Sequence, residues 1–325
     1  MTAAYPCDLH CHTTRSDGCD TPRELISNAA ALGLKIIAIT DHDVPPPETV
    51  EVNGTQIPVA AYAALKGISV LRGSEISCET EVEDVHLVVL GCDWGDPFFA
   101  QLEAQVQRSK IDSYRKLIEL IHEDGYNITW GDVLYNGGNP ILPEQTQKKL
   151  IFERLAQIGF AESWSAAKLR CKQTERYCVM RPKPNPIDVI SEAHRCGGIA
   201  ILAHPFLIAE PVAVDGNALT RSAYIERLIA AGLDGIEARY TYDKTSYSGD
   251  LAPDEIEQLV CSQYGERLEI ISAGSDYHAD HKKGVQDARK LGERGLTLEE
   301  FSSFGRLREI AKSEMSAVRS RCAIG

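Results

Sequence analysis

Short apolar runs alternate with amphipathic helical patterns along most of the chain. Each apolar run is four to six residues long, which suits a buried strand, and segments between them such as residues 187–195 have helical spacing. The runs that we expect to form strands are residues 35–40, 68–71, 85–90, 198–202, 235–238 and 268–272. This alternation predicts a parallel α/β barrel or sheet.

Two capping boxes mark the starts of helices. Thr21 is followed by Pro22 and Glu24, which suit an N-cap, the first helical position and the glutamate that bonds back to the cap. Thr297 and Glu300 repeat this spacing near the end of the chain, where we expect residues 282–325 to form a polar, helical tail. The first helix is expected to bury Leu25, Ile26, Ala29 and Leu32.

Residues 98–182 interrupt the alternation, because helical patterns follow one another there with few strand candidates between them. A long amphipathic helix is expected at residues 104–124, a second at 144–158 and a third at 163–171. We therefore expect a small helical insert domain at residues 98–182, which would cover one mouth of a barrel formed by residues 1–97 and 183–325.

Composition indicates which binding partners and which cellular compartment to expect. Of the 325 residues 43% are hydrophobic, which is ordinary for a globular protein, and the formal net charge of −13 opposes sequence-independent binding of duplex nucleic acid. No apolar run approaches the length of a transmembrane helix, so no membrane span is expected. The first residues lack the pattern of a signal peptide, which favours a cytoplasmic protein.

Histidines and carboxylates stand where several predicted strands end. They are Asp41 and His42 after residues 35–40, Glu75 after 68–71, His204 after 198–202, and Asp276 and His278 after 268–272. Because the carboxyl ends of the strands form the active-site face of a barrel, these side chains are expected to meet there. A single histidine or carboxylate at a strand end can have a purely structural role, but their recurrence at the ends of several strands favours a functional site.

Four more residues join this set. His10 and His12 are two positions apart, so in a strand both imidazoles point to the same side, as one metal centre needs. His86 stands near the start of its predicted strand rather than at the end. Its side chain can nevertheless share an inward face with Val88 and Leu90. Asp17 completes the set.

The candidate ligands are too many for one zinc ion. They are His10, His12, Asp17, His42, Glu75, His86, His204, Asp276 and His278. Mixed imidazole and carboxylate ligation suits two or three Mn, Fe or Zn ions. Such sites suit the hydrolysis of phosphate esters, because the metals neutralise phosphate oxygens, lower the pKa of bound water and stabilise the attacking and leaving oxygens. The ten cysteines contain no C-x-x-C pair, so a zinc ribbon is not expected.

As an ordered set, six motifs resemble those of the PHP (polymerase and histidinol phosphatase) family. They are His10-x-His12, Ser16-Asp17-Gly18, Thr40-Asp41-His42-Asp43, Gly73-Ser74-Glu75-Ile76-Ser77, Leu202-Ala203-His204-Pro205 and Gly274-Ser275-Asp276-Tyr277-His278. The resemblance spans nearly the whole chain. It implies a distorted (β/α)7 TIM-like barrel with a small helical insert, a trinuclear metal site and phosphoesterase activity.

The resemblance also implies a role for each ligand. One metal would be held by His10, His12, Glu75 and Asp276, a second by Glu75, His86 and His204, and a third by Asp17, His42 and His278. A hydroxide that bridges two of these metals is the implied nucleophile, and Glu75, Asp276 and His204 are the implied catalytic residues. Histidinol phosphatases often carry a histidine in place of Asp17, so the aspartate resembles the branch that acts on nucleotides and sugar phosphates.

Substrate contacts follow the family pattern less well. Relatives that act on nucleotides tend to carry Arg-Pro-His where this chain has Lys148-Lys149-Leu150. Arg181 matches a basic position of the family and Lys282 follows the last ligand motif, so we expect Lys148, Arg181 and Lys282 to contact substrate phosphate. Basic residues are frequent between 148 and 183, and they would form either a lid for a doubly phosphorylated small substrate or ordinary helix surface charge.

The expected function is hydrolysis of phosphate esters of a small phosphorylated metabolite. Within the family, the first candidate is hydrolysis of 5-phosphoribosyl 1,2-cyclic phosphate to ribose 5-phosphate and phosphate, and the alternative is a nucleoside 3′,5′-bisphosphate phosphatase. A different class is an accessory, non-catalytic PHP module, which the complete ligand set disfavours. An amide or C–N hydrolase on a similar barrel usually has a metal-bridging lysine, and no lysine stands at a matching strand end.

Overall fold

The computed structural model describes residues 2–78, 85–136, 138–146, 148–214 and 216–322. The chain divides into two compact units. We call them the barrel unit (residues 1–102 and 184–325) and the insert unit (residues 103–183). Within the described residues, no helix is both long and apolar enough to cross a membrane.

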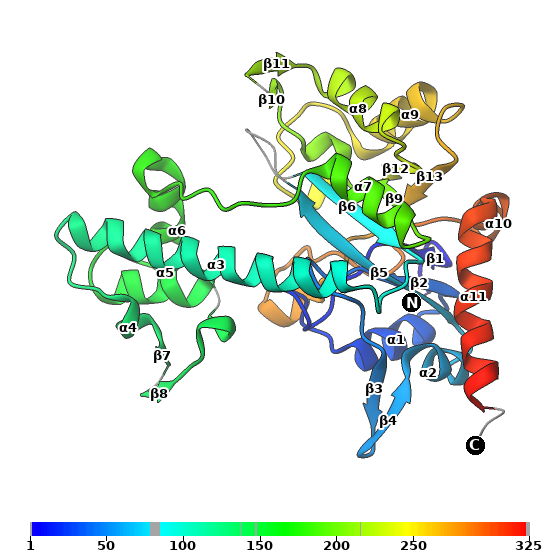
Figure 1. Ribbon diagram of the computed structural model, residues 1–325, viewed down its shortest axis with the longest axis horizontal. Helices are drawn as coiled ribbons and strands as arrows, with labels where there is room; N and C mark the ends of the chain where they lie inside the picture. Colours follow the sequence, from blue (N-terminus) through cyan, green and yellow to red (C-terminus); the bar gives the residue numbers. More distant parts are fainter. Residues whose placement is uncertain (1, 79–84, 137, 147, 215, 323–325) are drawn as a thin grey trace. The chain divides into compact units, whose positions relative to one another are not determined.

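A seven-stranded sheet forms the centre of the barrel unit (Figure 1). In spatial order its strands are β1 (Cys7–Asp8), β2 (Ile36–Ile39), β5 (Ser69–Cys78), β6 (Val85–Leu90), β9 (Ile199–Leu202), β12 (Gly235–Arg239) and β13 (Ile270–Ala273). The amide of Leu9, just beyond β1, donates to the carbonyl of Ala273 at 3.2 Å, so the two ends of the sheet meet. The nearly closed sheet confirms the predicted TIM-like barrel.

One strand of the barrel runs against the others, which corrects the expectation of a fully parallel sheet. Strand β6 pairs antiparallel with β5 and with β9. Only residues 79–84 connect β5 to β6, and a parallel crossover needs a dozen residues or more. His86 stands opposite Ser77, near the end of β5, so the start of β6 lies at the same edge as the ends of the parallel strands.

Helices surround this sheet and bury both of its faces. They are α1 (Pro22–Ala31), α2 (Val59–Leu65), α7 (Pro186–Arg195), α8 (Arg221–Ala230), α9 (Pro253–Tyr264), α10 (Leu298–Ser303) and α11 (Gly305–Cys322). In β2, Ala38 belongs to one apolar cluster, whereas Ile37 and Ile39 pack in a second cluster that contains Leu25 and Ile26 of α1. Burial on both faces explains why the strands have continuous apolar runs.

Both predicted capping boxes are present. The Thr21 hydroxyl accepts the amide of Glu24, and the Glu24 carboxylate accepts the amide of Thr21 at 2.7 Å. Thr297 and Glu300 do the same at the start of α10. The predicted helical tail is wrong for residues 284–297, which are irregular, because Gly284 and Gly292 adopt left-handed backbone conformations that end a helix.

Two small hairpins stand outside the sheet of the barrel unit, and the strand predictions do not include them. One joins β3 (Thr49–Val52) to β4 (Thr55–Pro58), and the other joins β10 (Val212–Val214) to β11 (Asn217–Leu219). Asn53 and Gly54 both have positive φ angles, 51° and 79°, as the tight turn between β3 and β4 requires. The Asn-Gly pair is the sequence signal that identifies this turn.

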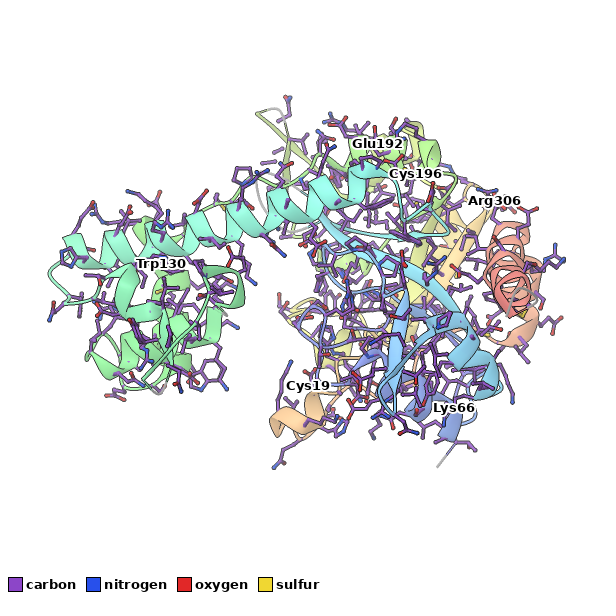
Figure 2. All side chains as sticks on the ribbon, turned by 60° about the horizontal axis from the view of Figure 1, so that its bottom comes forward. Cys19, Lys66, Trp130, Glu192, Cys196 and Arg306 are labelled. Carbon is purple, nitrogen blue, oxygen red and sulfur yellow. The ribbon has the colours of Figure 1, made fainter. Side chains whose placement is uncertain are left out.

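The insert unit is helical and has its own apolar core. Its helices are α3 (Pro97–Glu123), which begins in the barrel unit, α4 (Trp130–Val133), α5 (Lys148–Gln157) and α6 (Trp164–Gln173). A short hairpin pairs β7 (Tyr135–Asn136) with β8 (Asn139–Pro140). The core contains Ile121, Phe152 and Phe160, and Trp130, labelled in Figure 2, packs against it. The three helices predicted at residues 104–124, 144–158 and 163–171 are present as α3, α5 and α6.

Candidate metal centre

The first two candidate ligands lie just beyond β1 rather than inside a longer strand. The strand ends at Asp8, but Cys11 still forms a parallel bridge with Tyr277, and the rings of His10 and His12 lie 5.1 Å apart between centroids. Gly274 makes this packing possible, because a Cβ at that position would lie 2.3 Å from the Cβ of His10. The glycine therefore lets the segment that carries His10 lie close to the end of β13.

Glu75 lies at the centre of the site and is almost fully buried. Its Oε2 atom is 3.1 Å from Nε2 of His10, 3.1 Å from Nε2 of His12 and 3.2 Å from Nδ1 of His42. Glu75 belongs to β5, which continues to Cys78 and so extends beyond the predicted run at residues 68–71. One carboxylate oxygen thus contacts imidazoles from two separate segments of the chain.

The other oxygen of Glu75 contacts two more imidazoles. Oε1 lies 2.9 Å from Nδ1 of His86 and 2.9 Å from Nε2 of His204. His204 follows β9 with a φ angle of 28°, an uncommon conformation for a residue with a side chain. Glu75 therefore joins ligands contributed by β6 and β9 to those near β1 and β2.

Asp276 closes the site from the end of β13. Its Oδ1 atom lies 3.0 Å from Nε2 of His12, 3.6 Å from Nε2 of His10 and 3.4 Å from Nδ1 of His278. Its other oxygen, Oδ2, accepts a 2.7 Å hydrogen bond from the Tyr240 hydroxyl. Like His204, Asp276 has a positive φ angle, here 51°. Because Tyr240 binds Oδ2, the oxygen of Asp276 that faces the histidines is Oδ1.

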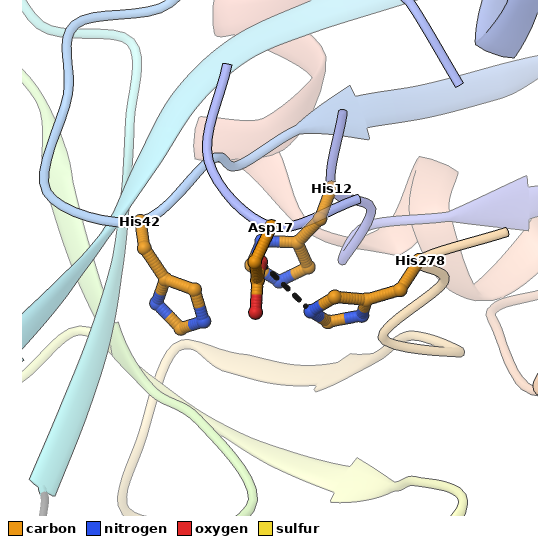
Figure 3. A group of neighbouring side chains, drawn as sticks. All are labelled: His12, Asp17, His42 and His278. Carbon is orange, nitrogen blue, oxygen red and sulfur yellow. Dashed lines mark ion pairs between the residues drawn. The ribbon is translucent and has the colours of Figure 1, made fainter. Parts of the chain in front are cut away.

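A third group of side chains gathers beside the first two (Figure 3). It consists of His12, Asp17, His42 and His278, and one ligand atom from each lies within 4.8 Å of the others. The dashed line in the figure joins Oδ1 of Asp17 to Nε2 of His278 at 3.1 Å. The structure therefore brings all nine candidate ligands into one region of the barrel unit.

The hydrogen-bonding state of these atoms fits a metal centre. Buried atoms without a hydrogen-bond partner among the described residues include Nε2 of His10, both ring nitrogens of His12, Nδ1 of His42, Oε2 of Glu75 and Oδ1 of Asp276. Leaving so many polar atoms unsatisfied would be costly in a folded protein. Imidazole and carboxylate donors suit divalent Mn, Fe or Zn, so the donor set fits such ions.

The carboxylates and imidazoles of the ligand shell shift one another's pKa. Burial lowers the pKa of each imidazole, but nearby carboxylates outweigh it and raise the pKa of His10 well above its ordinary value, that of His12 to about 10, and that of His86. Burial alone would raise the pKa of Glu75, but His42, His10 and His86 outweigh it and hold that pKa well below its ordinary range. Burial lowers the pKa of His42 to about 4, with Glu75 opposing the shift. Because metal binds neutral imidazole and ionised carboxylate, metal binding must release the protons that the carboxylates hold on His10 and His12.

Glu237 is a buried carboxylate that the strand-end pattern does not identify. It lies inside β12, where its Oε1 atom is 3.2 Å from Nδ1 of His10 and its Oε2 atom accepts the backbone amide of His204 at 2.8 Å. A carboxylate on the second ring nitrogen fixes the tautomer and orientation of a metal-binding histidine. The available signal was an acidic residue in the middle of an otherwise apolar run.

Glu237→Gln is expected to weaken Mn²⁺ binding about 10- to 100-fold. Glutamine keeps one acceptor oxygen, but its NH₂ group cannot accept, so it loses the hydrogen bond from either His10 or the His204 amide. Isothermal titration of the metal-free variant with Mn²⁺ measures the effect. Glu257→Gln, a change at a partly exposed glutamate of α9 that bonds Arg239, serves as the control. Equal Mn²⁺ affinity in wild type and Glu237→Gln would show that Glu237 does not orient the ligands.

Two further carboxylates hold the loops that carry the ligands. Asp41 accepts the Thr13 amide at 2.7 Å and the Ser16 hydroxyl at 2.6 Å, which holds the loop before Asp17. Asp8 accepts the Ser275 amide at 2.9 Å and so holds the turn before Asp276. Asp41 belongs to one of the motifs and Asp8 precedes His10 by two positions, and both support neighbouring segments.

A cavity of about 300 Å³ opens onto the candidate ligands. The residues that line it are His42, Glu75, His86, His204, Leu207, Tyr240, Lys244, Thr245, Ser246, Asp276, His278 and Arg289. Four of them come from the segment 240–246 after β12, and the sequence pattern identifies no functional residue after this predicted strand. A lysine and two hydroxyls directly after that strand were the available signal.

The expected phosphate contacts lie in two different places. Lys282 is outside the lining of the cavity, and its ammonium group lies 2.7 Å from Asp20 and 3.4 Å from Glu24. Lys148 and Arg181 belong to the insert unit. Burial, and then the charges of Lys168 and Arg181, lower the pKa of Lys148.

Known proteins resemble this chain over most of its length. A 3′,5′-nucleoside bisphosphate phosphatase of Chromobacterium violaceum is 28% identical over 85% of this chain and 88% of that protein. A 5′-3′ exoribonuclease of Haemophilus influenzae is 31% identical over 63% of this chain and 70% of that protein. A phosphoribosyl 1,2-cyclic phosphate 1,2-diphosphodiesterase of Eggerthella lenta is 26% identical over 83% of this chain and 93% of that protein.

A solved structure and a family model agree with these relatives. The crystal structure of a protein from Bifidobacterium adolescentis, described as a metal-dependent phosphoesterase, superposes with a TM-score of 0.64 and 25% identity over 94% of this chain and 96% of that chain. Fold, site and relatives together define a metal-dependent hydrolase of phosphate esters. The PHP domain model matches residues 8–159, and the chain belongs to the PHP family.

Proposed function

We propose that the centre holds two or three divalent ions and hydrolyses a phosphate ester of a small phosphorylated sugar or nucleotide. The observation that carries this proposal is the pair of contacts made by Glu75. Each of its oxygens faces a different set of imidazoles, at distances between 2.9 and 3.2 Å. A carboxylate in this position can join two metal sites that act on one phosphate.

The ligands divide into three overlapping groups. The proposed sets are His10, His12, Glu75 and Asp276 for one ion, Glu75, His86 and His204 for a second, and Asp17, His42 and His278 for a third, with His12 close to the last set. When bound, such ions neutralise phosphate oxygens and lower the pKa of water. The protein's own contribution is to fix the ligands, through Glu237 behind His10 and through Tyr240 beside Asp276.

The first substrate candidate is 5-phosphoribosyl 1,2-cyclic phosphate, hydrolysed in two steps to ribose 5-phosphate and inorganic phosphate. Similarity to the Eggerthella lenta enzyme over 83% of the chain supports it. The cavity of about 300 Å³ lies at the low end of small-molecule sites, which favours one sugar ring with its phosphates over a larger nucleotide.

The second candidate is a nucleoside 3′,5′-bisphosphate, supported by similarity to the Chromobacterium violaceum phosphatase over 85% of the chain. The 5′ end of single-stranded RNA is a third substrate to test, because of the Haemophilus influenzae relative. In the insert unit, Lys149 lies over the half-exposed ring of Trp164 at 5.6 Å, an arrangement of cation and aromatic ring that suits a nucleobase and its phosphate.

A panel of substrates assayed with Mn²⁺-loaded protein tests the proposal. We expect phosphate release from the ribose cyclic phosphate to be fastest, with slower release from a nucleoside 3′,5′-bisphosphate. A 5′-phosphorylated oligoribonucleotide is followed by the release of mononucleotides, and chelator-treated protein is the control. If metal is bound and no substrate is turned over, the protein is an accessory module rather than a phosphoesterase.

A further inference from the structure

The cavity has a polar wall that is distinct from the candidate metal ligands. Two cations and two hydroxyls line it: Lys244, Arg289, Thr245 and Ser246. We call these four residues the phosphate wall. Lys244, Thr245 and Ser246 follow β12, whereas Arg289 lies on the segment between β13 and α10. All four belong to the barrel unit, so the wall does not depend on the insert unit.

Each cation of the phosphate wall pairs with at least one carboxylate that does not line the cavity. Nζ of Lys244 lies 2.7 Å from Oε2 of Glu293 and 3.4 Å from Oδ1 of Asp287. Nη2 of Arg289 lies 3.1 Å from Oδ2 of Asp280. Because these partners stand outside the lining, they fix the side chains in place, which reduces the conformational entropy that each cation would lose on binding an anion.

Positive charge remains available on the cavity side of the wall. Among the described residues that line the cavity, the only carboxylates are Glu75 and Asp276, both proposed metal ligands. Bound metal ions would neutralise the charge of these two carboxylates. Burial opposes ionisation of Lys244, but Glu293 and Asp287 raise its pKa, so its ammonium group stays charged.

We propose that the phosphate wall binds a second phosphate of the substrate, the one that is not hydrolysed at the metal centre. This inference rests on the proposed function, because both preferred substrates carry two phosphate groups. Lysine and arginine supply charge-assisted hydrogen bonds, and the Ser246 hydroxyl supplies a further donor, whereas the Thr245 hydroxyl already donates to the carbonyl of Tyr242 at 2.9 Å. The wall would therefore select doubly phosphorylated substrates, without a contribution from Lys148 or Arg181 of the insert unit.

Lys244 is the residue that tests the wall most directly. Arg289 also contacts Oδ2 of Asp276, so its replacement would disturb a proposed metal ligand. Among the described residues, the ammonium group of Lys244 contacts Glu293, Asp287 and the carbonyl of Ala288, none of which is a proposed ligand. Lys290, next to Arg289 in sequence, is an exposed lysine outside the cavity lining, so Lys290→Met is a matched control.

The first experiment compares substrates with and without the second phosphate. For wild type and Lys290→Met, we expect kcat/KM to be higher for a nucleoside 3′,5′-bisphosphate than for the 3′-monophosphate. Lys244→Met should lower kcat/KM about 10- to 100-fold for the bisphosphate, the size of a lost charge-assisted hydrogen bond, and about twofold or less for the monophosphate. An equal loss on both substrates would overturn the proposal.

The second experiment measures binding and does not require turnover. Calorimetric titration of Mn²⁺-loaded protein with ribose 5-phosphate should give a dissociation constant at least about tenfold higher for Lys244→Met than for Lys290→Met. Unchanged affinity in Lys244→Met would overturn the proposal. If no substrate of the panel is hydrolysed but this difference in binding is found, the proposed reaction fails while the phosphate wall stands.

A third variant separates binding from a structural role of the lysine. Glu293→Gln removes the main carboxylate partner of Lys244 but keeps the cation and the acceptor for the Lys290 amide. If Lys244 binds phosphate, Glu293→Gln should keep or increase the affinity for ribose 5-phosphate. If the Lys244–Glu293 pair serves only to hold the segment, both variants should lose affinity and melt at similarly lowered temperatures, and the proposal would be wrong.

Discussion

Glu75→Gln is expected to lower kcat for phosphate release by about a thousandfold or more, which corresponds to about 4 kcal/mol in the activation barrier. The amide has nearly the size of the carboxylate but no charge, and its NH₂ group cannot be a metal ligand. Because the two oxygens of Glu75 contact separate sets of imidazoles, this one change should affect two metal sites. Phosphate release and metal content per protein are both measured.

The control for this variant is Glu51→Gln, which changes an exposed glutamate of the β3–β4 hairpin by the same chemistry. Full activity is expected there. A Glu75→Gln protein that retains both its metal and its activity would refute the proposed role of Glu75 in joining the sites. Loss of metal together with activity would support it.

Removal of the metals is the second change with a large expected effect. Without ions, Glu75 and Asp276 remain as buried carboxylates with an unsatisfied oxygen each. Metal at about a thousand times its dissociation constant stabilises the folded state by about 4 kcal/mol. For a chain of this size, chelation should therefore lower the melting temperature by on the order of 10 °C.

Thermal melts of Mn²⁺-loaded and chelator-treated protein measure this shift. The wild-type protein should show the full difference, and Glu75→Gln should show a much smaller one because its loaded state holds less metal. Equal melting temperatures for the loaded and chelated wild type would mean that the site does not bind Mn²⁺ strongly enough to act as its resident ion.

The barrel and most of the ligand set could be predicted from sequence because both leave local patterns. A buried strand is a short apolar run, and a residue such as His204 or Asp276 is recognisable by following one directly. Local patterns do not report the direction of a strand. His86 looked like an exception to the strand-end pattern only because β6 runs antiparallel, which places its start at the functional edge.

The residues that sequence could not predict act through contacts between distant segments. Glu237 supports His10, which is 227 positions away, and Arg289 reaches the cavity from an irregular segment with no periodic pattern. Lys282 follows a ligand motif in sequence, yet its ammonium group pairs with Asp20. Substrate contacts depend on such tertiary geometry, so residue type and spacing alone do not identify them.

The backbone at two ligands has a consequence for natural variation in the family. His204 and Asp276 both have positive φ angles, which cost a residue with a side chain about 1 to 3 kcal/mol and cost glycine almost nothing. Selection for metal binding must hold a histidine and an aspartate there against a gain in stability. In a relative that has lost catalysis, these two positions should be among the first to change to glycine or asparagine, so their identity reports whether the centre is still in use.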